Sequence, residues 1–341
     1  MMKTFRLLLF VWLLSLTLSC TRDKNPISAD FPVISPDGKI IYECETNLYL
    51  DPNGRLWSWG LNLSGQAGQG TTNPVEGPTP INTINHVIDF DTYQGVCLAA
   101  DADGNLWKWG YWYPTSFYYE PVWTPKIIAN LPGVISIGSY LLCDNSTVWK
   151  MDSFSLIMQR SQIPEQVPGI DNIKSISGSL AINQNGELKS LADPPTPVEW
   201  GGYITMDQIS QLQKGAKHCV VLKTDGTVWA WGQNDIGALG DGTNTHSAVP
   251  VRVTGLDHVV QISADASSNL ALKDDGSVWY WGNTGIRDEN EKYIGIQTLE
   301  HIETNGPVAY IHAGFDCMLI QKDGTLWTFN IKDRVVHKID L

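Results

Sequence analysis

HCVVLKTDGTVWAWG, residues 218–232, decides the fold of this chain. Val220, Val221 and Leu222 form an apolar run typical of a buried strand. Asp225-Gly226 then indicates a tight hairpin, because aspartate followed by glycine suits a type I′ turn. The alternation after the turn places Trp229 and Trp231 on one face of the second strand. One hairpin cannot bury two indoles, so the stretch predicts a neighbouring sheet packed against them.

The same turn recurs along the chain at intervals of 40 to 50 residues. The seven turn pairs are Asn53-Gly54, Asp103-Gly104, Asn145-Ser146, Asn185-Gly186, Asp225-Gly226, Asp275-Gly276 and Asp323-Gly324. A repeat of this length, built from short strands, is typical of propeller blades. The sequence therefore predicts an all-β, seven-bladed β-propeller over residues 38–341.

Two stretches resemble a known repeat family: LALKDDGSVWYWG at 270–282 and WGQNDIGALGDGT at 231–243. Both are similar to the regulator-of-chromosome-condensation repeat, whose fold is a seven-bladed β-propeller. The resemblance implies that the glycine-rich loops at 65–70 and 237–242 are ordinary repeat loops, and that His218 makes an inner-strand hydrogen bond. The third and fourth units depart from the pattern, since Ser146 replaces the turn glycine and KSL at 189–191 replaces Trp-x-Trp.

The amino-terminal residues have the composition of an export signal. Lys3 and Arg6 precede an apolar run at 7–18, and the run ends in LTLSC with Cys20 last. This order predicts a bacterial lipoprotein signal peptide at 1–19, an acyl (palmitate) anchor on Cys20 and a tether at 20–37. Ordinary secretion with a nearby cysteine is the alternative. We expect a cell-envelope location, periplasmic or surface-exposed, and we expect residues 31–34 to add a strand that closes the ring.

Charge and cysteine content narrow the range of functions. The formal net charge of −13 disfavours nucleic acid as a partner. The best-known proteins of the similar family act on chromatin and on a small GTPase, so the resemblance supports the fold and not that function. Five cysteines follow Cys20, and an odd number argues against a disulfide framework. Cys97, Cys219 and Cys317 share one register, which predicts packing roles.

The sequence shows no catalytic, cofactor or metal motif. It has no Gly-x-Ser-x-Gly elbow, phosphate-binding loop or dinucleotide fingerprint, and its seven histidines lack a paired metal spacing. Asp101-x-Asp103-x-Asn105 resembles the start of a calcium loop, but its glycine falls too early, and the hairpin turn explains the spacing. We therefore expect no cofactor and no metal.

Residues 111–123, YWYPTSFYYEPVW, replace the usual glycine-rich loop of the second unit. Tyrosine and tryptophan offer large, rigid contact areas, so such a segment suits a protein interface or a sugar-binding surface. Filling a gap beside the degenerate third unit is the structural alternative. The candidate binding residues are Tyr111, Trp112, Tyr113, Phe117, Tyr118, Tyr119 and Trp123. The mixed charges at 283–303 are a lesser candidate.

Together these features predict a non-catalytic, monomeric lipoprotein propeller that binds an unknown protein partner through its loop face. A glycan-binding surface protein that uses residues 111–123 is the first alternative. A hydrolase or lyase with its site at the propeller mouth is the second.

Overall fold

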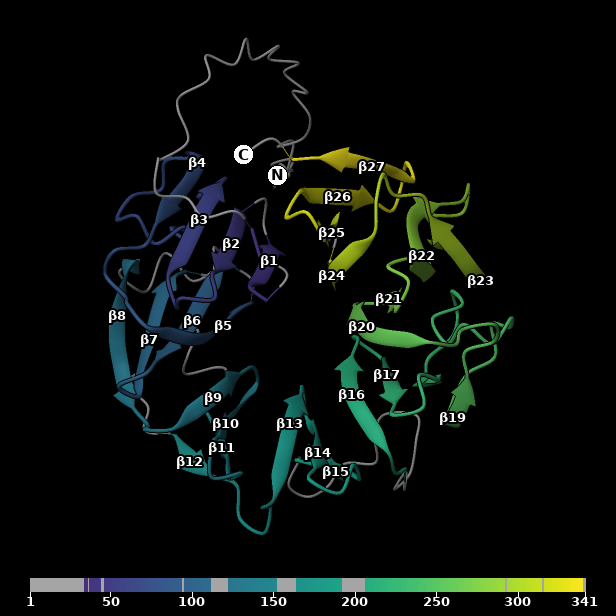
Figure 1. Ribbon diagram of the computed structural model, residues 1–341, viewed down its shortest axis with the longest axis horizontal. Coiled ribbons are helices and arrows are strands. Elements are labelled where there is room, and N and C mark those ends of the chain that lie inside the picture. The colour runs from purple at the N-terminus through teal and green to yellow at the C-terminus, as the bar shows by residue number, and fades with distance from the viewer. Residues whose placement is uncertain are drawn as a thin grey trace, which may run out of the picture.

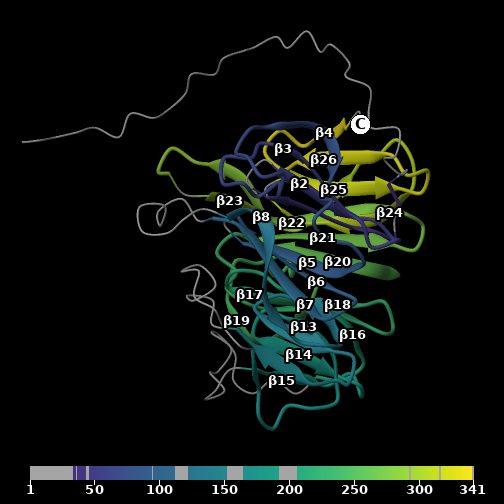
Figure 2. The same cartoon turned by 90° about the vertical axis from the view of Figure 1, so that its left-hand side faces the viewer.

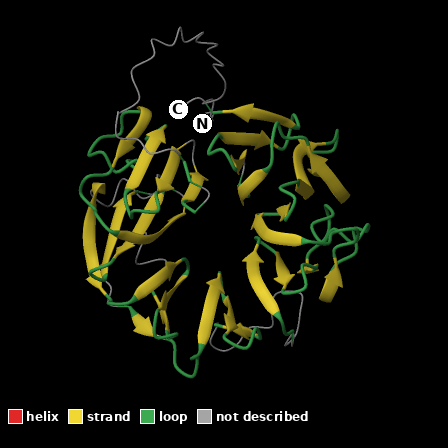
Figure 3. Cartoon of the chain, viewed as in Figure 1, coloured by secondary structure: helices red, strands yellow, loops and turns green. Residues whose placement is uncertain are grey.

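The computed structural model describes residues 34–35, 37–43, 46–93, 95–111, 122–151, 164–191, 206–291, 293–314 and 316–339. Every regular element within these ranges is a β-strand (Figure 3). The strands form seven sheets arranged in a ring around a central axis, in chain order (Figure 1). The predicted all-β, seven-bladed propeller is therefore confirmed. The described residues contain no helix long and apolar enough to span a membrane.

Each blade is an antiparallel sheet that runs from an inner strand to an outer strand. Blade 1 contains β1 (Lys39–Glu43), β2 (Thr46–Leu50), β3 (Leu56–Gly60) and β4 (Val75–Pro80). Blade 2 contains β5 (Val87–Tyr93), β6 (Val96–Asp101), β7 (Asn105–Gly110) and β8 (Val122–Asn130). Blade 3 contains β9 (Val134–Ile137), β10 (Tyr140–Cys143), β11 (Val148–Lys150) and β12 (Glu165–Gln166).

Blade 4 has three strands within the described residues: β13 (Ile173–Ser177), β14 (Leu180–Asn183) and β15 (Leu188–Ser190). Blade 5 contains β16 (Ile209–Lys214), β17 (His218–Lys223), β18 (Val228–Gly232) and β19 (Ser247–Arg252). Blade 6 contains β20 (Val259–Asp265), β21 (Ser268–Lys273), β22 (Val278–Arg287) and β23 (Tyr293–Ile302). Blade 7 contains β24 (Val308–His312), β25 (Asp316–Gln321), β26 (Leu326–Asn330) and β27 (Val335–Lys338).

The ring closes where blade 7 meets blade 1. Blade 7 takes all four of its strands from one continuous stretch of chain. Ile34 lies outside any strand, but it is buried with Trp57 and Leu326 in a cluster that joins the two blades. Residues 31–33 of the expected closing strand lie outside the described residues. At Ile34, apolar packing thus links the first and last blades.

The hairpin turns differ from the predicted type I′ geometry. Positive φ is confined to the third loop residue, as in Gly226 (φ 80°), whereas Asp225 is not left-handed. Lys223 N donates to Thr227 O, and Gly226 N donates to Lys223 O. This is the three-residue hairpin with a glycine bulge, in which an aspartate side chain also caps the turn: Asp225 Oδ1 accepts from Thr227 N at 3.0 Å. Ser146 takes the glycine position with φ 64°.

The paired tryptophans pack against a neighbouring blade, as predicted, and that blade is the preceding one in the chain. Trp109 is buried in the core between blades 1 and 2, and Trp281 is buried in the core between blades 5 and 6. The first indole of each of these pairs is only half-buried at its blade edge. Cys97, Cys219 and Cys317 are buried and form no disulfide, which confirms their packing role.

Hydrogen bonds between neighbouring inner strands hold the blades together around the axis. Gln211 Oε1 accepts from Ile262 N at 3.0 Å, and Gln261 Oε1 accepts from Ile311 N at 3.1 Å. Asp89 Oδ2 likewise accepts from Ile137 N at 2.7 Å. These polar side chains occupy one register of the inner strands, so they fix the blade spacing along the axis.

Candidate functional site

The loops between the third and fourth strands lie on one face of the ring, which we call the loop face; the Asp-Gly turns lie on the other. In blade 5 this loop folds around Asn234, which is fully buried. Asn234 Oδ1 accepts from Leu239 N at 2.9 Å, and Asn234 Nδ2 donates to Thr243 O and Thr245 O. In blade 1, Asn62 makes the same three kinds of bond to Ala67 N, Thr71 O and Asn73 O.

Each of these loops also hydrogen-bonds to the next blade. Trp109 Nε1 of blade 2 donates to Gln66 O of blade 1 at 2.7 Å, and Trp281 Nε1 of blade 6 donates to Ala238 O of blade 5 at 3.0 Å. The glycine-rich loops thus have a structural role, as expected of ordinary repeat loops, and they also act as clasps between blades.

His218 has the inner hydrogen-bonding role that the resemblance implied. Its Nε2 lies 2.7 Å from Asn269 Oδ1, and the imidazole is only 3% exposed. Burial lowers the pKa of His218, against the opposing effect of hydrogen bonds to Asn269 and Ala266. Asn269 Nδ2 in turn donates to Ala238 O at 3.1 Å. His218 therefore belongs to the clasp between blades 5 and 6.

The aromatic segment enters and leaves blade 2 over the clasp of blade 1. Trp112, Tyr113, Phe117, Tyr118 and Tyr119 lie outside the described residues, whereas Tyr111 and Trp123 lie within them. Tyr111 N donates to Ser64 O at 3.0 Å, and Gly70 N donates to Trp123 O at 3.0 Å. The Trp123 indole lies on Gly65, where a Cβ would come within 2.5 Å of Trp123 Cδ1. Both ends of the segment are thus anchored to the neighbouring blade.

This anchoring leaves apolar side chains exposed on the loop face. Trp123 is 37% exposed, and Leu63, in the same clasp, is 67% exposed. Tyr111 is half-buried, and its hydroxyl donates to Leu63 O at 3.4 Å. We call Leu63, Tyr111 and Trp123 the aromatic patch. Sequence reasoning missed Leu63, because one leucine in a polar loop carries no signal until the fold places it beside Tyr111.

The polar residues at the propeller axis bond to one another and to the backbone of the inner strands. Lys39 Nζ lies 2.7 Å from Asp89 Oδ1 and also donates to Phe90 O. Burial lowers the pKa of His312 to about 4, with a further contribution from Lys39. Burial also raises the pKa of Tyr310 to about 12. The Asp89 carboxylate accepts from Lys39 Nζ and from the backbone amide of Ile137, so it links blades 1, 2 and 3.

Asp101 is likewise a turn residue. Its carboxylate accepts from Asp103 N, from Asn105 N and Nδ2, and from Trp107 Nε1 at 2.8–3.0 Å. Burial would raise the pKa of Asp101, but these hydrogen bonds outweigh burial and lower it. Within the described ranges, no three His, Cys, Asp or Glu residues are grouped to hold a metal ion.

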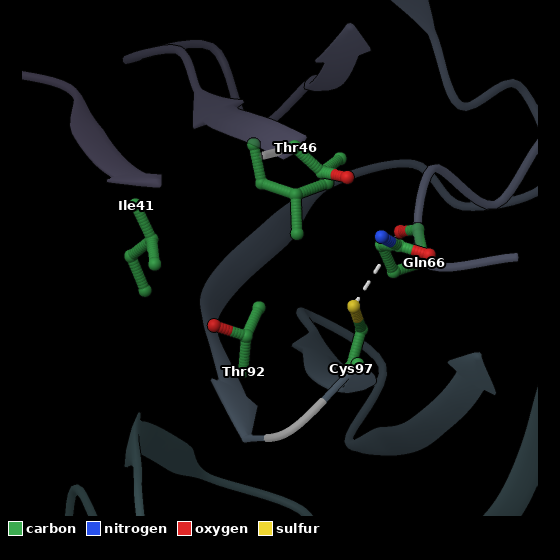
Figure 4. A pocket seen from close by; sticks show the side chains of 7 residues that line it. Ile41, Thr46, Gln66, Thr92 and Cys97 are labelled. Atoms are coloured by element: carbon green, nitrogen blue, oxygen red, sulfur yellow. Dashed lines mark hydrogen bonds between the residues drawn. The ribbon is translucent and has the colours of Figure 1, made fainter. Parts of the chain in front are cut away.

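Blade junctions on the loop face differ in how much space they enclose. Between blades 1 and 2, Thr46, Gln66, Thr92 and Cys97 line a cavity of about 10 Å³, and Cys97 Sγ donates to Gln66 O at 3.5 Å (Figure 4). Between blades 5 and 6 the equivalent place is a cleft of about 280 Å³. The charged segment at 283–303 forms part of its wall as the extended β22–β23 hairpin, visible beyond the ring in Figure 2.

Comparison with known proteins finds the same repeat. Residues 53–92 and 225–272 match the Regulator of chromosome condensation (RCC1) repeat, and residues 209–237 match a second description of it. The chain is 28% identical over 256 residues to the mouse E3 ubiquitin-protein ligase HERC2, covering 61% of this chain and 5% of the ligase. It is 25% identical over 232 residues to a human RCC1-like G exchanging factor-like protein, covering 64% of this chain and 46% of that protein.

Among solved structures, PorZ of Porphyromonas gingivalis, a surface component of its type-IX secretion system, is similar with a TM-score of 0.50 and 11% identity. That match covers 89% of this chain and 38% of PorZ, and it supports the fold alone. The curated relatives are longer than the region matched, which spans less than half of either one.

Proposed function

Because the chain is a seven-bladed propeller that carries regulator of chromosome condensation repeats, we propose that it is a non-catalytic scaffold that binds a protein partner through its loop face. The observation that carries this proposal is the aromatic patch. Trp123 and Leu63 expose apolar surface on anchored backbone, where an interface gains contact area without ordering a loose loop. The net charge of −13 favours a partner with a basic surface around that patch.

The test is site-specific crosslinking in envelope extract. A photoreactive residue at position 63 would be compared with one at position 249, where Val249 is 65% exposed on the outer strand β19. We expect one protein to crosslink at position 63 and not at position 249. Leu63→Lys, a change at an exposed position that leaves the core intact, should abolish capture of that protein. Equal crosslinking at both positions would contradict the proposal.

The affinity should depend most on Trp123. Buried interface tryptophans typically contribute about 2 kcal/mol or more to binding. Trp123→Ala should therefore weaken binding of the purified partner by roughly 30-fold. Circular dichroism would confirm that the variant is folded. Val249→Ala is the matched control, and it should bind like the unchanged chain.

We also propose that the chain is a lipoprotein of the bacterial cell envelope, anchored through Cys20. The support is the order of Lys3, Arg6, the apolar run and Cys20. Cys20→Ser should move the protein from the membrane fraction to the soluble fraction and remove labelling by a palmitate analogue. A membrane-bound, labelled Cys20→Ser variant would refute the anchor.

A further inference from the structure

The cleft between blades 5 and 6 is a preformed concave site on the loop face. Its volume is about 280 Å³, and Lys217, Gln233, Asp235, Ile236, Ala238 and Tyr293 line it. The backbone that forms it is tightly packed, since a Cβ on Gly295 of β23 would lie 1.9 Å from Ile236 O. The cleft therefore exists without a ligand and would need little ordering to bind one.

One difference in side-chain size accompanies the difference between this cleft and the small cavity between blades 1 and 2. Gln66 and Ala238 are equivalent, because the carbonyl of each accepts from the next blade's buried tryptophan. The Gln66 side chain folds back and accepts from Ser64 N at 2.8 Å. Ala238 has only a methyl group at this position, and it lines the cleft.

The charges in the cleft disfavour a charged ligand. Lys217 is exposed, and no salt bridge in the described part of the chain engages it. Asp235 lies 3.4 Å from His246 Nε2 and accepts from Gln233 Nε2. An anion would meet Asp235, and a cation would meet Lys217, so either would face one like charge. A neutral ligand with several hydroxyls can donate to the carboxylate and accept from the ammonium group.

The apolar part of the lining suits a ring. Tyr293 is 43% exposed, and Arg287 lies 4.5 Å from its ring centroid, which restricts how the ring turns. Ile236 and Ala238 provide aliphatic surface in the same cleft. The C–H face of a pyranose packs on such a surface because aromatic faces are electron-rich.

We infer that this cleft binds one ring of a neutral sugar, with hydroxyls hydrogen-bonded to Asp235, Lys217 and Gln233 and the ring packed against Tyr293. The site is separate from the aromatic patch and does not depend on the proposed protein partner. A loop-face surface with both sites would recognise a protein and a glycan independently.

The test is isothermal titration of the full chain with methyl glycosides of glucose, galactose, mannose and N-acetylglucosamine, and with inorganic phosphate and leucine as charged and zwitterionic probes. We expect saturable binding of at least one glycoside and of neither other probe. Ala238→Gln should fill the cleft with the residue that blade 1 already accommodates, and Tyr293→Ala should remove the ring. Each should weaken binding by about tenfold or more.

Leu63→Lys, which alters only the aromatic patch, should bind the sugar normally. Leu63→Lys therefore separates the two proposals, since it should lose the protein partner and keep the sugar. The inference is overturned if no glycoside binds, if phosphate or leucine binds in their place, or if Ala238→Gln and Tyr293→Ala bind the sugar as well as the unchanged chain.

Discussion

Replacing Asn234 by alanine should destabilise the propeller more than any exposed change in the same loop. The side chain is fully buried and hydrogen-bonds to Leu239 N, Thr243 O and Thr245 O within the clasp of blade 5. Its loss leaves the amide of buried Leu239 without an acceptor, at a cost of about 1–3 kcal/mol. Thr243 and Thr245 are exposed, so their carbonyls regain water and add only about 1 kcal/mol. The expected loss of unfolding free energy is about 2–4 kcal/mol.

Urea unfolding followed by tryptophan fluorescence and circular dichroism would measure this loss as a shift of the midpoint at constant slope. Asn62→Ala is the matched variant in blade 1 and should lose a similar amount. Asn244→Ala, at an exposed position of the same loop, should change stability by less than about 0.5 kcal/mol. Hydrogen exchange gives a local measure, because the Leu239 amide should lose protection in Asn234→Ala while the Ala67 amide keeps it. An Asn234→Ala midpoint equal to that of Asn244→Ala would refute the clasp as a stabilising unit.

Three further outcomes are expected. Trp281→Phe should lower the unfolding free energy by about 1–3 kcal/mol, because it removes the hydrogen bond to Ala238 O and leaves a cavity. An unchanged urea midpoint would contradict this. Lys39→Met should lose about 1.5–3 kcal/mol in the same assay, because Asp89 stays buried without its cation, and Lys39→Arg should recover part of the loss. Stability should fall as pH falls from about 6.5 to 4, because the pKa of His312 is held at about 4 in the folded state and the unfolded state binds more protons in that window. The slope attributable to His312 is at most about 1.4 kcal/mol per pH unit, and His312→Asn should flatten it; an equal slope in that variant would show that other groups carry the dependence.

The repeat could be predicted from the sequence because its signals are local. A turn glycine, a β-rich run on each side and Trp-x-Trp fall within fifteen residues, as in residues 218–232, and period-2 alternation fixes which face the indoles share. The turn type was predicted wrongly, since Asp225-Gly226 fits both a two-residue type I′ turn and the three-residue loop with a glycine bulge. Pairing beyond the turn decides between them.

The candidate site was only partly predictable. Residues 111–123 stood out by composition, but neither the anchoring of Trp123 on Gly65 nor the exposure of Leu63 follows from it. Both features depend on how blade 2 lies over the loop of blade 1, which comes much earlier in the chain.

The sequence by itself determined the number of blades, the hairpins and the face of each strand that the tryptophans occupy, because these follow from residue spacing within one unit. Only the tertiary structure decided how the units hold one another. Trp281 reaches Ala238, Gln261 reaches Ile311, and residues of blades 5 and 6 together form a cleft of about 280 Å³. Such contacts join atoms of adjacent blades, and no pattern within a single repeat specifies which of its side chains meets the next.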